Sequence, residues 1–325
     1  MASLSGTQKL SAAVDAGGEN ITLAANSLQI DASVRSSNAE LNILTIDPSR
    51  YVVLGDLKAS SVYSETQDMV LQNNELNKID SSFSEIVIGG LGSYNKVIIG
   101  DENKTVAVST NLVINTTGVG GEIIQNQALT VAGNFTTWGS GNTQHLSADR
   151  TVGGSETVND SIVLEQETSG DGVITVIAGN AGTKGDITWG TAGLGHYLDG
   201  TASDGVPNEL VLTAKNGGDI IINQIVGKVT AIDGLTISEA HDVTFNEDVS
   251  VHGDVIIHAT GTVIFKKGLT ITGGGSLVIL ANNAEDPNEK VLIIRGFNPN
   301  SRGKLLSAQP LFDGFVDYLR IVGEQ

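Results

Sequence analysis

The 325-residue sequence contains no cysteine, only five prolines and few aromatic residues, namely seven Phe, five Tyr and two Trp. Without cysteine, the chain can form neither a disulfide framework nor a thiolate metal site. The scarcity of proline and the lack of a Gly-X-Y period exclude a collagen-like chain. With so few aromatic side chains, a core has to be aliphatic, which favours a thin, repeated core over one bulky centre.

Long apolar runs and basic residues are also scarce. The longest apolar run, 277–281, has five residues, whereas a membrane-spanning helix needs about 20. No membrane insertion is therefore expected, and the N-terminal residues lack the basic and apolar regions of a signal peptide. The 18 Lys and Arg against 37 Asp and Glu give a net charge of −19, which argues against a nucleic-acid partner.

Glycine is abundant, with 40 residues, and short strand patterns recur at a fixed distance. Three-residue patterns with apolar first and third residues occur at 235–237, 243–245, 249–251, 255–257, 263–265 and 269–271. Each of the first three recurs 20 residues later, and the segments between them contain Gly, Asn, Asp or His, which suit tight corners. A period of three strands predicts an all-β fold, a three-sided parallel β-solenoid with about 20 residues per coil in this regular part.

The same pattern extends upstream, so one elongated β-helix is expected over 1–300. Two Gly-rich stretches, near 137–161 and 189–209, are expected to be irregular loops. Residues 301–325 are expected to form a C-terminal capping or irregular segment, because their apolar residues have helical spacing after Pro310. A continuing strand pattern is the alternative. A cap would cover the core and the strand edges of the last coil.

The segments 208–223, 234–237, 242–246 and 253–257 resemble the repeats of filamentous-haemagglutinin-like giant bacterial surface proteins. This resemblance implies a right-handed parallel β-helix and an exported protein, extracellular or on the cell surface in association with the outer membrane. It also implies adhesion as the function. The expected partners are host, partner-cell or matrix surface molecules, including glycans, and flanking repeats of a longer parent chain.

Parallel β-helices also include polysaccharide lyases and hydrolases, which require a groove where at least two carboxylates and a basic residue converge. Asp186, Asp219 and Asp254 each follow a glycine at a strand start, but Arg150 is the only basic residue between Lys104 and Lys184. Each Gly-Asp pair is therefore interpreted as a corner whose carboxylate binds local backbone. A structural and adhesive function without catalytic residues is preferred, and a carbohydrate-active enzyme is the alternative.

No cofactor or dedicated metal site is expected. The segment 89–94 has tyrosine where the calcium-binding nonapeptide has aspartate, which leaves only adventitious calcium at acidic corners. The two tryptophans occur in matching contexts: Trp138-Gly139 precedes His145, and Trp189-Gly190 precedes His196, with the same spacing. These four aromatic side chains are the candidate contacts for a glycan or another ligand, and packing beneath duplicated loops is the alternative.

Overall fold

The computed structural model describes residues 7–47, 49–89, 96–116, 121–139, 142–165, 172–180, 182–201 and 208–281, and the backbone of 290–295 and 319–321. These residues form two compact units, Met1–Asp160 and Ser161–Gln325. Both units consist of short strands, nearly all in parallel sheets, as the sequence predicts. The expectation of a single elongated domain stays a prediction.

The first unit contains three sets of strands that alternate along the chain. Its elements are, in chain order, β1 (Thr7–Leu10), β2 (Val14–Asp15), β3 (Ile21–Ala25), β4 (Ser27–Ile30), β5 (Val34–Arg35), β6 (Glu40–Thr45), β7 (Val52–Leu54), β8 (Met69–Leu71), α1 (Asn73–Leu76), β9 (Glu85–Ile88), β10 (Lys96–Ile99), β11 (Val106–Val108), β12 (Asn111–Asn115), β13 (Glu122–Gln125), β14 (Leu129–Val131), β15 (Phe135–Trp138), β16 (Thr143–Leu146), β17 (Arg150–Val152) and β18 (Glu156–Val158). From β9 to β15 each strand pairs in parallel with the strand three further along the chain.

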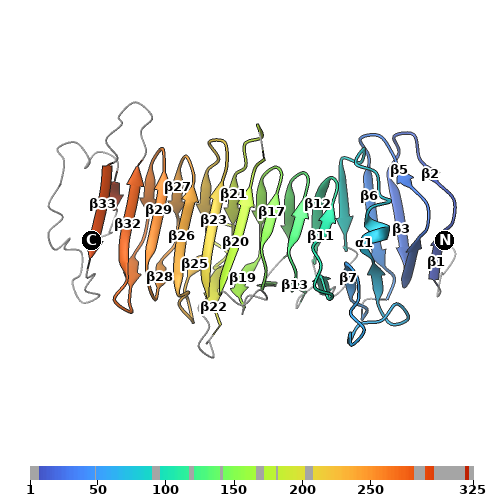
Figure 1. The fold of residues 1–325 in the computed structure, drawn as a ribbon, viewed down its shortest axis with the longest axis horizontal. Helices are drawn as coiled ribbons and strands as arrows, with labels where there is room; N and C mark the ends of the chain where they lie inside the picture. Colours follow the sequence, from blue (N-terminus) through green and yellow to red (C-terminus); the bar gives the residue numbers. More distant parts are fainter. Residues whose placement is uncertain are drawn as a thin grey trace. The chain divides into compact units, whose positions relative to one another are not determined.

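The second unit follows the same rule. Its strands are β19 (Ser161–Leu164), β20 (Val173–Ala178), β21 (Ile187–Trp189), β22 (Tyr197–Gly200), β23 (Glu209–Ala214), β24 (Ile220–Ile222), β25 (Ile225–Val226), β26 (Gly234–Glu239), β27 (Val243–Phe245), β28 (Val249–Val251), β29 (Val255–Ala259), β30 (Val263–Phe265), β31 (Leu269–Ile271), β32 (Ser276–Ala281), β33 (Lys290–Arg295) and β34 (Leu319–Ile321). Figure 1 shows β20, β23, β26, β29 and β32 side by side as one parallel sheet. Two pairings break the rule: β33 joins β32 antiparallel, and β34 joins β30 in parallel.

The predicted 20-residue period is the observed register. Leu235 pairs with Val255, Val243 with Val263, and Val249 with Leu269. Elsewhere the offset is longer, as between Ile187 and Ile220, because more residues lie in the corner segments of those coils. The strands are therefore repeated more regularly than the corners that join them.

The core consists of columns of aliphatic side chains from successive strands. In β24, Ile220 and Ile222 are buried while Ile221 between them is exposed, as alternation along a strand requires. Because parallel strands lie about 4.8 Å apart, equivalent inward side chains come into contact. Phe245 and Phe265, paired in register, have parallel rings whose centroids are 4.8 Å apart. Two of the few aromatic residues thus stack along one column of the core.

Asparagine side chains connect the corners of neighbouring coils in the first unit. Asn111 Oδ1 accepts the backbone N–H of Asn134 at 2.7 Å, and Asn134 Oδ1 accepts that of Ser155 at 2.8 Å. The residues before the two donors are Gly133 and Gly154. A Cβ atom at either glycine would lie 2.1 Å from the Oδ1 of the Asn one coil earlier. At these two corners glycine is therefore required, because the crossing Asn side chain occupies the space that a Cβ would need.

Charged residues also enter the core of the first unit. Arg150 and Glu156 are both fully buried, and Arg150 Nη1 lies 3.0 Å from Glu156 Oε1. Gln125 Oε1 accepts hydrogen bonds from the Arg150 guanidinium, whose central carbon is 4.3 Å from the centre of the Phe135 ring. This pairing satisfies charges that would otherwise be strongly unfavourable in an apolar interior.

The expectation of an irregular loop over 137–161 is wrong. This stretch contains β16, β17 and β18. Gln144, Arg150 and Glu156 occupy inward positions, so the apolar alternation that marks a strand is absent, and Gly154 has a packing role. In the other stretch, 190–196 forms a turn and β22 follows it, while 202–207 lies outside the described residues. The expected C-terminal segment, 301–325, also lies outside them, except for strand β34.

We predict that Gly154→Ala destabilises the protein by about 1–2 kcal/mol, because the new methyl group displaces Asn134 and the Ser155 N–H loses its partner. Gly234→Ala is the control, since its nearest neighbour is the flexible Glu209 side chain at 3.1 Å. Thermal denaturation of both variants tests this. Equal melting temperatures for the two would contradict the proposed role of glycine.

We predict that Arg150→Met destabilises the protein by about 3–5 kcal/mol, because Glu156 keeps a buried charge without its main partner. The double variant Arg150→Met/Glu156→Leu should recover most of this loss, since no buried charge of the pair remains. Chemical denaturation of the single and double variants measures the difference. A double variant no more stable than the single one would show that the pair does not act as a unit.

Candidate functional site

Five charged or titratable side chains meet at the starts of β21, β24 and β27 in the second unit. Strand register aligns Ile187, Ile220 and Val243. The residues just before them, Asp186, Asp219 and Asp242, therefore form a column at one corner. Lys184 and His241 lie beside this column, and we call the five residues the corner cluster.

Each aspartate of the column binds the backbone of the next coil. Asp186 Oδ1 accepts the N–H of Asp219 at 2.9 Å, and Asp219 Oδ1 accepts that of Asp242 at 3.1 Å. Asp242 Oδ1 in turn accepts the N–H of Thr262 at 2.6 Å. The same holds for Asp254, which binds the N–H of Ser276. The carboxylates bind backbone, as predicted, but the prediction that this backbone lies in the local corner is wrong, because it belongs to the next coil.

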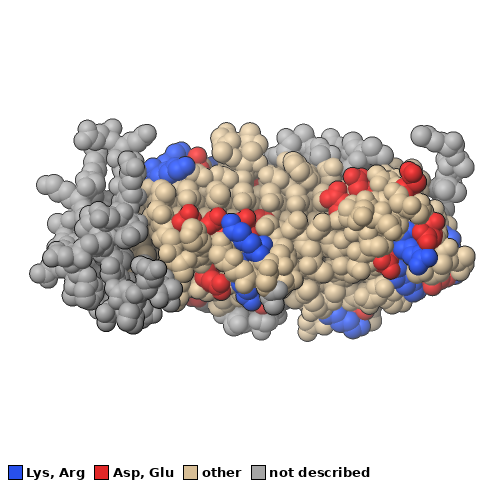
Figure 2. Space-filling model, turned by 90° about the horizontal axis from the view of Figure 1, so that it is seen from above, with Lys and Arg blue, Asp and Glu red and all other residues tan. Residues whose placement is uncertain are grey.

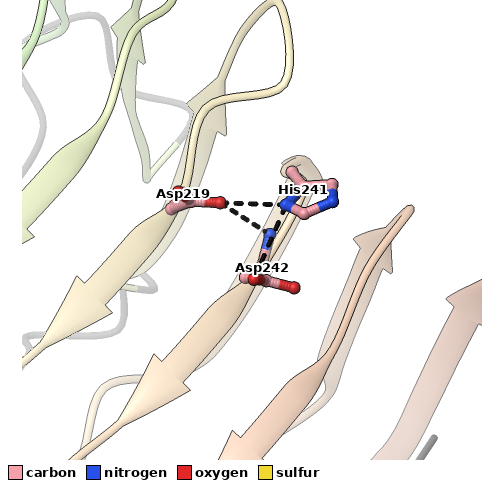
Figure 3. A group of neighbouring side chains, drawn as sticks. All are labelled: Asp219, His241 and Asp242. Carbon is pink, nitrogen blue, oxygen red and sulfur yellow. Dashed lines mark hydrogen bonds and ion pairs between the residues drawn. The ribbon is translucent and has the colours of Figure 1, made fainter.

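His241 occupies a position that is glycine in the neighbouring coils. The residue two before the aligned strand residue is Gly185, Gly218, His241 and Gly261 in four successive coils. The His241 side chain is about half exposed, and its Nδ1 lies 3.2 Å from Asp219 Oδ1 and 3.6 Å from Asp242 Oδ2. Figure 3 shows the imidazole beside both carboxylates. One imidazole and two carboxylates from two coils thus converge.

Lys184 closes the other side of the corner cluster. Its Nζ lies 3.0 Å from both Asp186 Oδ1 and Asp219 Oδ2, and these bonds raise the pKa of Lys184. Partial burial raises the pKa of Asp219, but bonds from Lys184, the Asp242 N–H and His241 outweigh it, so this pKa lies below its usual range. Asp219 is therefore ionised at neutral pH and suits binding a cation better than donating a proton.

A second concentration of charged groups surrounds a cavity of about 320 Å³ in the first unit. Glu75, in α1, is buried beside it, and its Oε1 accepts the N–H of Ile30 while its Oε2 accepts that of Gln72. Lys78 donates to the Ile30 carbonyl at 2.8 Å, and Glu65 completes the set of charges nearest to Glu75. Burial raises the pKa of Glu75 despite the two N–H donors.

The matching Trp-Gly segments have different environments. Trp138 ends β15 with 54% of its side chain exposed, whereas Trp189 in β21 is fully buried in the core. His145 lies in β16, in a different sheet from Trp138. His196 is buried, and its Nδ1 accepts the N–H of Thr191 at 3.2 Å. Of the two tryptophans, only Trp138 offers its ring to a ligand; packing accounts for Trp189.

Sequence reasoning selected Asp186 and Asp219 but missed Lys184, His241 and Asp242. A signal for His241 was present in the sequence. The 20-residue offset between Val243 and Val263 makes His241 equivalent to Gly261, so a histidine stands where the next coil has glycine. The cavity beside Glu75 had no comparable signal, because its residues come from coils that depart from the regular pattern.

The surface carries charges of both signs. On the face shown in Figure 2, basic and acidic side chains form small mixed groups separated by uncharged surface. This pattern differs from the continuous basic face typical of nucleic-acid binding. Within the described residues, no helix has the length and apolar character needed to span a membrane.

We predict that Glu75 makes the stability of the protein depend on pH. Because its pKa is raised in the folded state, the folded chain binds more protons than the unfolded chain above about pH 4, and stability falls as pH rises. The stability of the wild type relative to Glu75→Gln should therefore decrease from about pH 4 to about pH 7 in chemical denaturation. The exposed Glu19→Gln serves as the control, and a constant difference for Glu75→Gln would contradict the prediction.

No family model, curated protein or solved structure matches the chain. The resemblance to filamentous-haemagglutinin-like repeats therefore stays a prediction from the residues quoted above. Because one fold can carry many functions, the function has to be argued from the architecture and from the sites just described.

Proposed function

We propose that this chain is a right-handed, three-sided parallel β-solenoid segment of a large bacterial cell-surface or secreted protein, with a structural and adhesive function. The observation that carries the proposal is the parallel pairing of most strands with the third strand along, seen in both units. Such pairing needs three changes of direction per coil. Parallel connections within one sheet are right-handed in about 98% of known cases, which supports the handedness.

The adhesive part of the proposal is supported by what the coils present to solvent. Several outward strand positions carry exposed hydroxyl side chains, as at Thr22, Thr130 and Thr151. Such a surface suits hydrogen bonding to glycans and to protein surface molecules of a host, partner cell or matrix. The net charge of −19 favours solubility and opposes aggregation through strand edges.

A carbohydrate-active enzyme is the second candidate, because the cavity beside Glu75 brings carboxylates and Lys78 together. A carboxyl group with a raised pKa is typical of a general acid. Both Glu75 oxygens, however, accept backbone N–H groups, of Ile30 and Gln72. These bonds give Glu75 a structural role in joining coils, and the adhesive function is therefore preferred.

We predict that the immobilised chain binds cells or a glycan array and that Trp138→Ala weakens this binding several-fold, because the exposed ring offers a stacking face for a sugar. Val62→Ala, which shortens an apolar side chain 83% exposed, is the control and should bind normally. The same preparations are incubated with a polysaccharide panel.

Unchanged binding by Trp138→Ala would show that Trp138 does not contact the ligand. A wild-type chain that binds no glycan and no cell surface would contradict the adhesive function. If the wild type degrades a polysaccharide and Glu75→Gln does not, the protein is a carbohydrate-active enzyme, and the adhesive function is replaced by this one.

A further inference from the structure

We propose that Asp219, His241 and Asp242 form a binding site for a divalent transition-metal ion such as Zn²⁺. His241 supplies Nδ1, and each aspartate supplies one carboxylate oxygen. The ligand atoms of the three residues all lie within 4.8 Å of one another, and no other group with three such ligands occurs within the described residues. Imidazole and carboxylate are ligands that these ions prefer.

Two of the three distances between the ligand atoms, those from the imidazole to each carboxylate, fit one small cation. Zinc bonds to nitrogen and oxygen are about 2.0–2.2 Å long, so two ligands at a tetrahedral angle lie about 3.3–3.6 Å apart. His241 Nδ1 is 3.2 Å from Asp219 Oδ1 and 3.6 Å from Asp242 Oδ2. The ligand atoms of the two aspartates lie within 4.8 Å of each other, so both carboxylates can turn toward an ion that the imidazole holds.

Hydrogen bonds orient both carboxylates toward the imidazole. The Thr262 N–H holds Asp242 Oδ1, which leaves Oδ2 facing His241. Lys184 holds Asp219 Oδ2, and Oδ1 has a second lone pair beyond the one used by the Asp242 N–H. Bonds of this kind fix the direction of metal ligands in proteins and raise their affinity.

The histidine itself distinguishes this corner from its neighbours. The equivalent residues are Gly185, Gly218 and Gly261, and a Cβ at Gly218 or Gly261 would lie 2.1 or 2.3 Å from an atom of the preceding coil. Only at 241 does an imidazole extend over the aspartate column. The site therefore depends on this departure from the repeat and not on the acidic residues alone.

Lys184 and the number of ligands define which ions fit. Calcium takes six to eight oxygen ligands, whereas Lys184 already occupies Asp219 Oδ2. Three protein ligands on a half-exposed corner leave the remaining coordination positions for water or for a ligand atom of a partner. This site is independent of the adhesive function, and either proposal can fail without the other.

The test is titration of the intact chain with Co²⁺, followed by its visible absorption, and with Zn²⁺ by calorimetry. The wild type should bind one ion at this site, and His241→Gly, which restores the residue of the neighbouring coils, should abolish that binding. Asp242→Asn keeps Oδ1 for the Thr262 N–H and should weaken binding at least about tenfold. His258→Ala, which removes an exposed histidine elsewhere, should bind as the wild type does.

Three results would overturn the proposal. These are a wild type that binds neither ion, binding that persists unchanged in His241→Gly, and binding that is lost in His258→Ala instead. If the wild type binds neither ion, the role of His241 is limited to its contacts with the carboxylates of Asp219 and Asp242. If His241→Gly does not fold, as judged by circular dichroism, His241→Gln provides the same comparison, because an amide is a much weaker ligand than imidazole.

Discussion

The structure depends on main-chain hydrogen bonds between parallel strands of successive coils. Because these bonds hold equivalent residues about 4.8 Å apart, every side chain has a defined neighbour one coil earlier and one coil later. Aliphatic columns, the Phe245 and Phe265 pair, and the asparagine and aspartate columns all follow from this spacing. Stability in each unit is therefore close to a sum of contacts between nearest coils.

The corners carry most of the chemical variety. Strand positions facing the core are restricted by packing, whereas the corner residues differ in number and type from coil to coil. The corner cluster and the cavity beside Glu75 both arise where a corner departs from the repeat. Polar residues in the core, such as Arg150 and Glu156, are a different kind of departure, because they are matched within the unit and do not reach solvent.

The regular register could be predicted from the sequence because residues 235–271 alternate cleanly and repeat at a constant offset. The strands around Arg150 could not, because inward polar side chains remove the alternation by which a strand is recognised. The pairing of β7 with β8, which are consecutive along the chain, also breaks the rule of three strands. Two of the five residues of the corner cluster, Asp186 and Asp219, were visible as Gly-Asp pairs, but the approach of His241 to two carboxylates depends on side-chain directions that spacing alone does not fix.

The asparagine bridges have a consequence for how such a chain can change over time. Asn134 and Gly154 are 20 residues apart, yet a Cβ at 154 would meet the Asn134 amide. Loss of the bridging amide therefore makes room for a side chain at 154, whereas a side chain gained first at 154 costs the chain this bridge. Among relatives of this chain, paired changes at these two positions, with few sequences that retain Asn above a bulky residue, would be the evolutionary trace of a contact between coils.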